Sequence, residues 1–489
     1  MNLDSNIVQK TIQSLLTDVT PKVLTSPDIS NAVLLTDSVQ NVREHSTPTS
    51  SSQKKHKEGK GEAPTTRHKT EEKNNEKKHH ADTSNDDDDD DDDDHDSVIE
   101  LYEQINAANI EFTTQTKSGC LKFQESDIEI QSQVPYPESI SEKYISSEMR
   151  EYIKNSSKKI LSFECKINER KIFLQFVLFK NHNCEAASYY KTYAHRVFMW
   201  LHMASLKSNC VKSLNIYIYL TPFKKELPEN KSEVIGPVNA NTGYTYRCEK
   251  NNEIVIYRQE EWFKVFIHET MHTFGNDFEA ELHDVDDTVI KKIFSLPQGV
   301  DIRLSETYSE IWARIMNVAF QTYFKNPPSL ESKTAKQFKK NFEFYLHLES
   351  IFSLYQCIKV LDFMGVNYQL MVSDSAHSKK MTDAFYRENT NVFAYYVLTS
   401  VLLHSHDDFF TWCAKRNGPG LNMFKVKTAQ DEFAELVESC YKKNDLLQKI
   451  VETETKVARD YQKAISSKNG GDKDKELVTT LRMTIVGFD

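Results

Sequence analysis

Residues 262–275 read WFKVFIHETMHTFG and follow directly after a predicted strand. This stretch is predicted to form a helix that carries two histidines, His268 and His272, four residues apart. Positions i and i+4 of a helix lie one turn apart on the same face, so both imidazoles can reach a single Zn²⁺ ion. Gly275 stands where a glycine in the left-handed conformation would end the helix. The stretch therefore predicts a helix that binds a metal ion.

Glu269 stands next to the first of these histidines. A carboxylate in this position can face a water molecule on the metal and accept its proton while the water attacks a carbonyl group. We therefore expect Glu269 to act as the general base of a hydrolytic reaction.

A pair of acidic residues lies further along the chain. A catalytic zinc ion needs a third protein ligand and leaves its fourth position to water. The predicted helix 304–324 contains Glu306 and Glu310, which share one face that is separate from the apolar stripe of the helix. One carboxylate would bind the metal, and the other would accept the free ring N–H of a histidine ligand and fix its orientation.

The two motifs together resemble a known family. HETMH followed by SETYSE is similar to the gluzincin metallopeptidases, whose glutamate ligand is followed four positions later by a second acidic residue. The form E-x-x-x-E on an aromatic-rich helix resembles the lethal-factor-type branch in particular. The resemblance covers residues 268–313 and implies that Glu306 is the third ligand, with Glu310 as its supporting acidic residue.

Other patterns remain open or are disfavoured. In the aminopeptidase branch the ligand glutamate precedes x-aromatic-Ala, which would match residues 310–313 and make Glu310 the ligand; we prefer Glu306. A weaker similarity is to uncharacterised HExxH proteins of large DNA viruses. The metzincin pattern HExxHxxGxxH is disfavoured because Phe278, which cannot bind zinc, occupies the third-ligand position. Asp277 could bind a metal ion, but it stands one residue before the position that the metzincin pattern requires.

The resemblance also implies where the substrate binds. Gluzincins hold the substrate backbone along an edge strand beside the motif helix, as in β-augmentation. The segment 236–244 is the candidate for this edge, with Asn239, Asn241 and Gly243 as substrate-binding residues; an ordinary Asn/Gly turn is the alternative.

A peptidase of this kind also benefits from a donor that stabilises the developing oxyanion. Tyr395 and Tyr396 are the candidates in the helical half of the chain, and Tyr396 is taken as the catalytic one. The apolar neighbours of both residues suggest a buried helix, so a purely structural role in the core is the alternative.

Charge is distributed unevenly along the 489 residues. Residues 1–97 contain 21 acidic and 12 basic side chains, a net charge of −9 out of −11, so the remainder is nearly neutral. The nearly neutral remainder lacks the basic excess of a nucleic-acid-binding protein. Asp86 to Asp94 form an unbroken acidic run, and the segment 1–97 is predicted to be a leader and a disordered linker.

The cysteines and the hydropathy bear on the compartment. Eight cysteines are scattered with no CxxC pair, which favours free thiols in a reducing environment. The first 16 residues are a poor secretory signal, and no stretch reaches 18 uninterrupted apolar residues. We therefore expect no membrane span and a cytoplasmic or otherwise intracellular protein rather than a secreted one. The weaker similarity to viral HExxH proteins implies the virion as a further location.

The expected fold class is α+β, a zincin-like two-lobe catalytic domain. Residues 98–260 would form an upper lobe with a small mixed sheet, 261–425 the zinc-binding helices and helical lower lobe, and 426–489 a C-terminal helical segment and a strand-like tail. The expected strands lie at 160–167, 171–180, 214–221, 244–247 and 253–258, and the expected helices at 186–206, 304–324, 334–364, 390–404 and 428–467.

Taken together, these patterns predict a zinc-dependent peptidase that cleaves within a peptide chain rather than at its ends, because no feature would anchor a free amine or carboxylate. Its partner would be a peptide or protein substrate, and its oligomeric state is left open. The alternative is a non-catalytic zincin-fold protein, structural or virion-associated, that binds peptides or assists assembly. Retention of Glu269 argues against that alternative, because a binding module has no need of the base.

Overall fold

In the computed structural model, the residues described are 96–137, 144–180, 187–278, 287–325, 333–418, 429–466 and 472–487. The predicted leader and linker, 1–97, therefore lies outside them except for its last two residues. Asp96 accepts a hydrogen bond from the amide of Val98 (3.0 Å) and caps α3 (Ser97–Lys117). A regular helix thus begins where the composition changes.

A six-stranded mixed sheet has the strand order β1-β2-β3-β4-β6-β5. The strands are β1 (Lys122–Asp127), β2 (Ser157–Ile167), β3 (Arg170–Phe179), β4 (Ser213–Tyr219), β5 (Gly243–Thr245) and β6 (Asn251–Ile256). β3, β4 and β6 run parallel to one another, and the other pairs are antiparallel. The predicted hairpin turns at Asn168 and Glu169, both at positive φ. The α+β class and the expected strands are confirmed.

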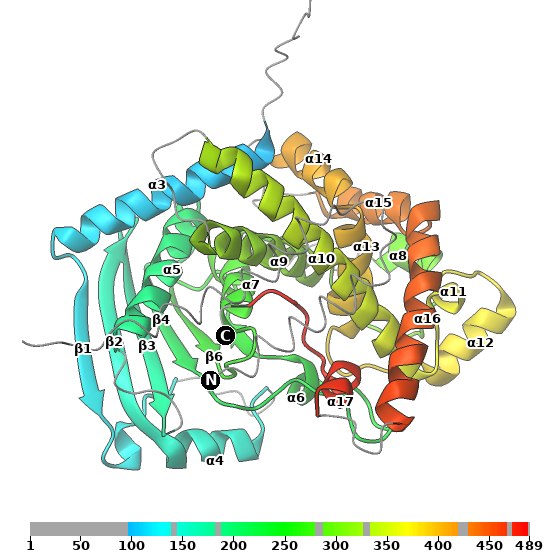
Figure 1. Cartoon of the computed structure of the whole chain (residues 1–489), viewed down its shortest axis with the longest axis horizontal. Helices are drawn as coiled ribbons and strands as arrows, with labels where there is room; N and C mark the ends of the chain where they lie inside the picture. The colour runs from blue at the N-terminus through cyan, green and yellow to red at the C-terminus, as the bar shows by residue number, and fades with distance from the viewer. Residues whose placement is uncertain are drawn as a thin grey trace, which may run out of the picture. The chain divides into compact units, whose positions relative to one another are not determined.

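The two faces of the sheet carry different hydrophobic clusters because successive strand residues point to opposite sides. Phe176 of β3 belongs to the larger core, which α3, α5 (Ala187–Ser205) and α7 (Trp262–Phe274) cover. Val177 belongs to a smaller cluster beneath α4 (Ser147–Ser156). Figure 1 shows α7 between the sheet and the helical half, with β6 leading into it.

Helix α9 (Leu304–Lys325), in the helical half of the chain, is buried on nearly every side. The predicted helices 304–324 and 334–364 are confirmed, whereas 428–467 is two helices separated by a turn, and 390–404 begins as a π-helix. No helix in the described ranges is both long and apolar enough to cross a membrane.

The remaining helices are η1 (Gln131–Gln133), α6 (Pro237–Ala240), α8 (Asp287–Ile293), α10 (Lys333–Met364), α11 (Tyr368–Met371), α12 (Ala376–Phe385), η3 (Phe393–Leu398), α13 (Thr399–His404), α14 (His406–Asn417), α15 (Gln430–Cys440), α16 (Asn444–Ser466) and α17 (Asp472–Thr479).

The expectation of free thiols is wrong for two cysteines. Cys210 and Cys248 form a disulfide between the loop before β4 and the turn between β5 and β6. They are 38 residues apart, and only the sheet topology brings these two loops together, so the spacing alone could not reveal the pair. The other cysteines described are free thiols: Cys120, Cys165, Cys357, Cys413 and Cys440.

The C-terminal tail is buried rather than laid on the surface. After α17, Thr480 forms a single bridge with Glu226, and residues 481–486 continue without regular structure. Leu481 and Thr484 are completely buried. Figure 1 shows this red segment running from α17 back towards α7. The predicted strand-like tail is therefore mostly a helix followed by an irregular buried segment.

The tail makes stability depend on pH through Glu349 of α10. Its Oε2 accepts hydrogen bonds from the Thr484 hydroxyl (2.9 Å) and the Ile485 amide (3.0 Å). Burial raises the pKa of Glu349 from 4.5 to about 7. The folded state thus holds this proton more tightly, so the contribution to stability is complete below pH 4.5 and is lost as pH rises through about 7.

We therefore expect Glu349→Gln to be more stable than the wild type at pH 8, by up to about 3 kcal/mol, and to differ much less at pH 5. The glutamine keeps an oxygen for the two donors of the tail but has no proton to lose. Urea unfolding at the two pH values measures the difference. An equal pH dependence in both proteins would contradict the assignment.

Candidate metal centre

The helix that carries the histidines has well-defined ends. Helix α7 starts after Glu261, whose φ of 58° is left-handed, and it ends at Gly275, whose φ is 60°. The predicted glycine cap is therefore confirmed. The rings of His268 and His272 lie on one face with their centroids 5.0 Å apart.

Three ligand atoms converge on one point. His268 Nε2 lies 3.2 Å from His272 Nε2 and 3.2 Å from Glu306 Oε2. His272 Nε2 lies 3.5 Å from the same carboxylate oxygen. Among the residues described, this is the group of His, Cys, Asp or Glu side chains that could hold a metal ion. The i, i+4 histidine pair and the glutamate from α9 are thus brought together as the sequence predicts.

The opposite nitrogens of the two rings face carboxylates. His272 Nδ1 is 2.5 Å from Asp277 Oδ2. His268 Nδ1 is 3.1 Å from Glu310 Oε2, although this contact is too bent for a well-aligned hydrogen bond. Carboxylates can only accept here, so they favour the hydrogen on Nδ1 and leave a lone pair on Nε2.

These atoms fit a small divalent cation. Two lone pairs and a carboxylate oxygen within 3.5 Å repel one another unless a positive charge lies between them. In a tetrahedral zinc site with bonds of about 2.0–2.1 Å, neighbouring ligand atoms are about 3.3–3.4 Å apart. The distances of 3.2, 3.2 and 3.5 Å between the three ligand atoms are close to that spacing.

The pKa shifts indicate the same preference for positive charge. Burial alone would lower the pKa of His272, but Glu306 and Asp277 outweigh it and raise the pKa well above its usual value. The pKa of His268 is also raised, against the effect of burial, by Glu306 and Glu310. Burial would raise the pKa of Glu306, but the two histidines hold it well below its usual range.

Glu310 is committed to other partners. Its carboxylate accepts hydrogen bonds from Lys264 Nζ (2.9 and 3.0 Å) and from Arg314 Nε (2.9 Å), and both cations are buried with it. Glu306, in contrast, points an oxygen at both histidine Nε2 atoms. This arrangement favours Glu306 over Glu310 as the ligand.

Glu269 lies beside the cluster. Its side chain is buried, and burial raises the pKa of its carboxyl while His268 and His272 pull it down. No hydrogen bond or ion pair of this carboxylate is found within the described ranges. A buried carboxyl with a raised pKa and no fixed partner is suited to accept and return a proton.

Tyr395, and not Tyr396, is the tyrosine at the cluster. The Tyr395 hydroxyl donates to Glu306 Oε2 (2.9 Å), and its ring lies 5.8 Å from that of His268. The Tyr396 hydroxyl donates instead to the Leu481 carbonyl (2.6 Å) in the buried tail. The choice of Tyr396 is therefore corrected, because its hydroxyl points away from the ligands.

The expected substrate segment is only partly available. The side chain of Asn239 accepts a hydrogen bond from the Gly236 amide at Oδ1 and donates one from Nδ2 to the Glu226 carbonyl. Asn241 Oδ1 accepts a hydrogen bond from the Thr390 hydroxyl (3.0 Å). Both side chains thus hold the protein together. Gly243 begins β5, the edge strand, which packs beside α7; an added Cβ there would meet Ile256 at 2.7 Å.

Four residues of the site were not assigned from the sequence: Asp277, Lys264, Arg314 and Arg247. Two of them had a local signal. Lys264 stands four residues before His268, and Arg314 four residues after Glu310, so each shares a helix face with a residue of the site. Asp277 and Arg247 depend on loops whose path the sequence does not reveal.

Comparisons with known proteins find no relative: no protein-family model, curated protein or solved structure matches this chain. What the site binds must therefore be inferred from its own residues.

The two glutamates should respond differently to substitution. If the site holds zinc, we expect Glu306→Gln to lose it to a competing chelator, because one of the three candidate ligands is gone. Glu310→Gln should retain one zinc per chain with an affinity reduced by about 10–100-fold, as is typical of residues that orient a ligand. Zinc content after chelator dialysis and a competition titration measure both. Normal zinc binding by Glu306→Gln would show that this glutamate is not a ligand.

Proposed function

We propose that the protein is a zinc-dependent peptidase whose metal is held by His268, His272 and Glu306. The observation that carries this proposal is the convergence of two Nε2 atoms and one carboxylate oxygen, with carboxylates beside both Nδ1 atoms. A closed structural zinc site has four protein ligands, whereas three are found here among the described residues. Three ligands leave a position for water, which favours catalysis.

The surrounding residues supply the remaining chemistry. Zinc in this position would act as a Lewis acid, lowering the pKa of a water molecule and polarising a peptide carbonyl. Glu269 would take the proton from the water and pass it to the leaving amine. The Tyr395 hydroxyl, released from Glu306, would donate to the oxygen that becomes negatively charged.

The finer parts of this proposal are expectations from the sequence. Cleavage within a peptide chain rests on the lack of a feature that would anchor a free amine or carboxylate. An intracellular location rests on the scattered cysteines and the poor secretory signal, and a virion location on the weaker similarity to viral HExxH proteins. A two-lobe zincin arrangement and a substrate strand paired with β5 rest on the resemblance to gluzincins. The position of β5 at the sheet edge, next to α7, supports the last of these. A non-catalytic zinc protein that binds peptides is the alternative.

The proposal is tested with the purified full-length chain. We expect one zinc per chain and cleavage of members of a peptide library, both abolished by His272→Ala. His404→Ala is the matched control, because His404 pairs with Asp445 and takes no part in the cluster. Zinc binding without cleavage of any peptide would support the non-catalytic alternative. No zinc at all would overturn both.

The adjacent tyrosines provide a sharper test of the site. We expect Tyr395→Phe to lower kcat by about 10²-fold, the usual effect of losing one oxyanion donor, with little change in KM. Tyr396→Phe should leave kcat unchanged and cost about 1 kcal/mol of stability, the value of its hydrogen bond to the tail. Steady-state kinetics and thermal unfolding of both variants check this. The reverse pattern would restore Tyr396 as the catalytic residue.

A further inference from the structure

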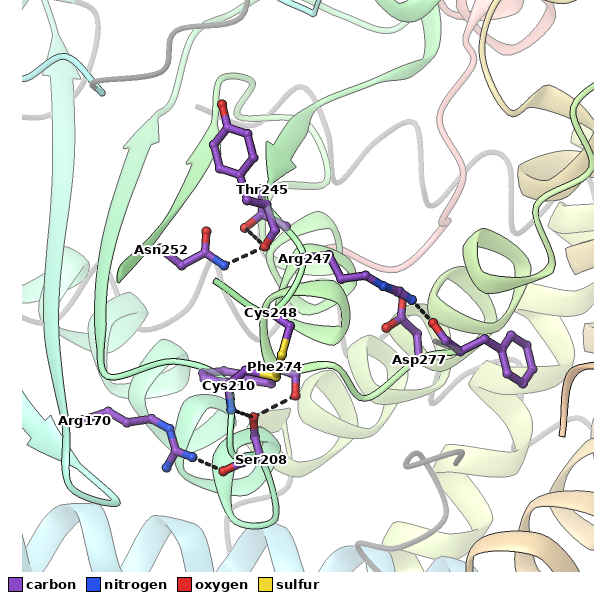
Figure 2. Close-up of a disulfide and its surroundings, with 11 residues drawn as sticks. Arg170, Ser208, Cys210, Thr245, Arg247, Cys248, Asn252, Phe274 and Asp277 are labelled. Atoms are coloured by element: carbon purple, nitrogen blue, oxygen red, sulfur yellow. Dashed lines mark hydrogen bonds and ion pairs between the residues drawn. A yellow bond between two sulfur atoms is a disulfide. The ribbon is translucent and has the colours of Figure 1, made fainter. Parts of the chain in front are cut away.

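The disulfide lies at the C-terminal end of the metal-binding helix. A Cβ added to Gly275 would lie 3.1 Å from Cys210 Sγ, so the disulfide packs directly against the residue that ends α7. The Cys248 amide donates to the backbone carbonyl of His272 (3.2 Å). Figure 2 shows the disulfide beside Phe274, with Arg247 reaching across to Asp277.

Arg247, the neighbour of Cys248, connects this disulfide to a metal ligand. Its guanidinium pairs with Asp277 Oδ2 at 2.7 and 2.8 Å and also donates to the Phe278 carbonyl. The same Asp277 oxygen faces His272 Nδ1 at 2.5 Å. Asp277 is completely inaccessible to solvent at its side chain, so its orientation depends on these two partners.

The backbone at Cys248 is held in an unfavourable conformation. Its φ of 51° is left-handed, which is unfavourable for a residue with a Cβ. The disulfide fixes the side chain of Cys248, and the bond to His272 fixes its amide. Without the disulfide the turn would be free to relax, and Arg247, which precedes Cys248 in the chain, would be expected to move with it.

We propose that Arg247 is a positioning residue for His272, acting through Asp277, and that the Cys210–Cys248 disulfide holds it in place. The affinity of the site for zinc would then depend on the redox state of this disulfide. A dithiol reductant would supply the two electrons and two protons: the bond between the two sulfurs breaks, two thiols form, and the dithiol becomes a disulfide. This inference rests on the proposed metal site but not on peptide hydrolysis.

The test measures zinc affinity by competition with a chromophoric chelator, in buffer without thiols. We expect Arg247→Ala to lower the affinity by about tenfold, at the lower end of the range for residues that orient a ligand. Arg247→Lys should recover part of it, because a cation still faces Asp277. The double variant Cys210→Ser/Cys248→Ser, which copies the reduced state without adding thiols that bind zinc, should also lose up to about tenfold. Cys120→Ser, at an exposed free thiol, should lose nothing.

A double-mutant cycle with Asp277→Asn separates a specific effect on the position of His272 from a general loss of order around the site. If the disulfide and Arg247 act through Asp277, their removal should have little further effect in that background. An undiminished effect there, or wild-type affinity in both Arg247→Ala and the cysteine variant, would overturn the proposal. Arg247→Ala keeps the disulfide, so it tests the positioning role of Arg247 even if the cysteine variant does not fold. A wild type that binds zinc but cleaves no peptide would refute the peptidase alone.

Discussion

Glu269→Gln is expected to reduce peptide cleavage by about 10²–10⁴-fold while one zinc per chain remains bound. Glutamine has the size of glutamate and can still hold a water molecule by a hydrogen bond, but it cannot accept a proton. The proposed ligands His268, His272 and Glu306 are untouched by this change, and the Glu269 carboxylate forms no hydrogen bond or ion pair with the described residues that the substitution would break. The loss should therefore appear in kcat rather than in metal content.

Two controls make this result decisive. Glu249→Gln removes an exposed carboxylate from the β5–β6 turn and should leave the rate unchanged. His272→Ala, measured in parallel, reports any cleavage by a contaminating peptidase. If Glu269→Gln keeps both its zinc and its full rate, the proposed general base is wrong.

The local part of the site could be predicted from the sequence. The spacing of His268 and His272 and the cap at Gly275 depend only on helix geometry, which the chain itself determines over a few residues. The spacing of Glu306 and Glu310 places both on one face of α9 for the same reason. The resemblance already favours Glu306 as the ligand, and the structure adds a physical reason: Lys264 and Arg314 pair with Glu310, while Glu306 faces the histidines.

The remaining features depend on contacts between distant segments. Tyr395 and Tyr396 lie in the π-helix η3, where an extra residue per turn changes which side chain faces the cluster, so α-helical periodicity could not decide between them. The disulfide and the path of Arg247 to Asp277 follow from strand order. The burial of the C-terminal tail could not be predicted for a similar reason: its partners lie on α7, α9, α10 and η3 and in the loop at Lys225.

Removing residues 480–489 is expected to prevent the chain from folding. Four apolar side chains of the tail are almost completely buried, and at about 1.5–3 kcal/mol each they contribute on the order of 6–12 kcal/mol. The whole stability of a domain is typically about 5–15 kcal/mol. The four are Leu481, Met483, Ile485 and Val486.

Removal of the tail would also leave buried polar groups around it without hydrogen-bond partners. Lys359, whose pKa burial lowers well below its usual value, donates to the carbonyls of Leu477 and Thr480. Glu261 accepts the amide of Met483 (2.6 Å) at the very start of α7, and it would be left with its ion pair to Lys225. Each unsatisfied buried group costs about 1–3 kcal/mol, which adds to the loss of apolar burial.

The tail also contacts a residue beside the candidate metal centre, so the truncation should affect both stability and the proposed zinc binding. Met483 Sδ lies 3.5 Å from Lys264 Nζ, the cation that holds Glu310 beside His268. Met483→Leu conserves the volume and should cost less than about 1.5 kcal/mol, with one zinc retained, which makes it the matched control. Size-exclusion chromatography, thermal unfolding and zinc content distinguish the two variants. A truncated chain that unfolds cooperatively near the full-length midpoint and retains zinc would show that the tail only covers the core and does not support the site.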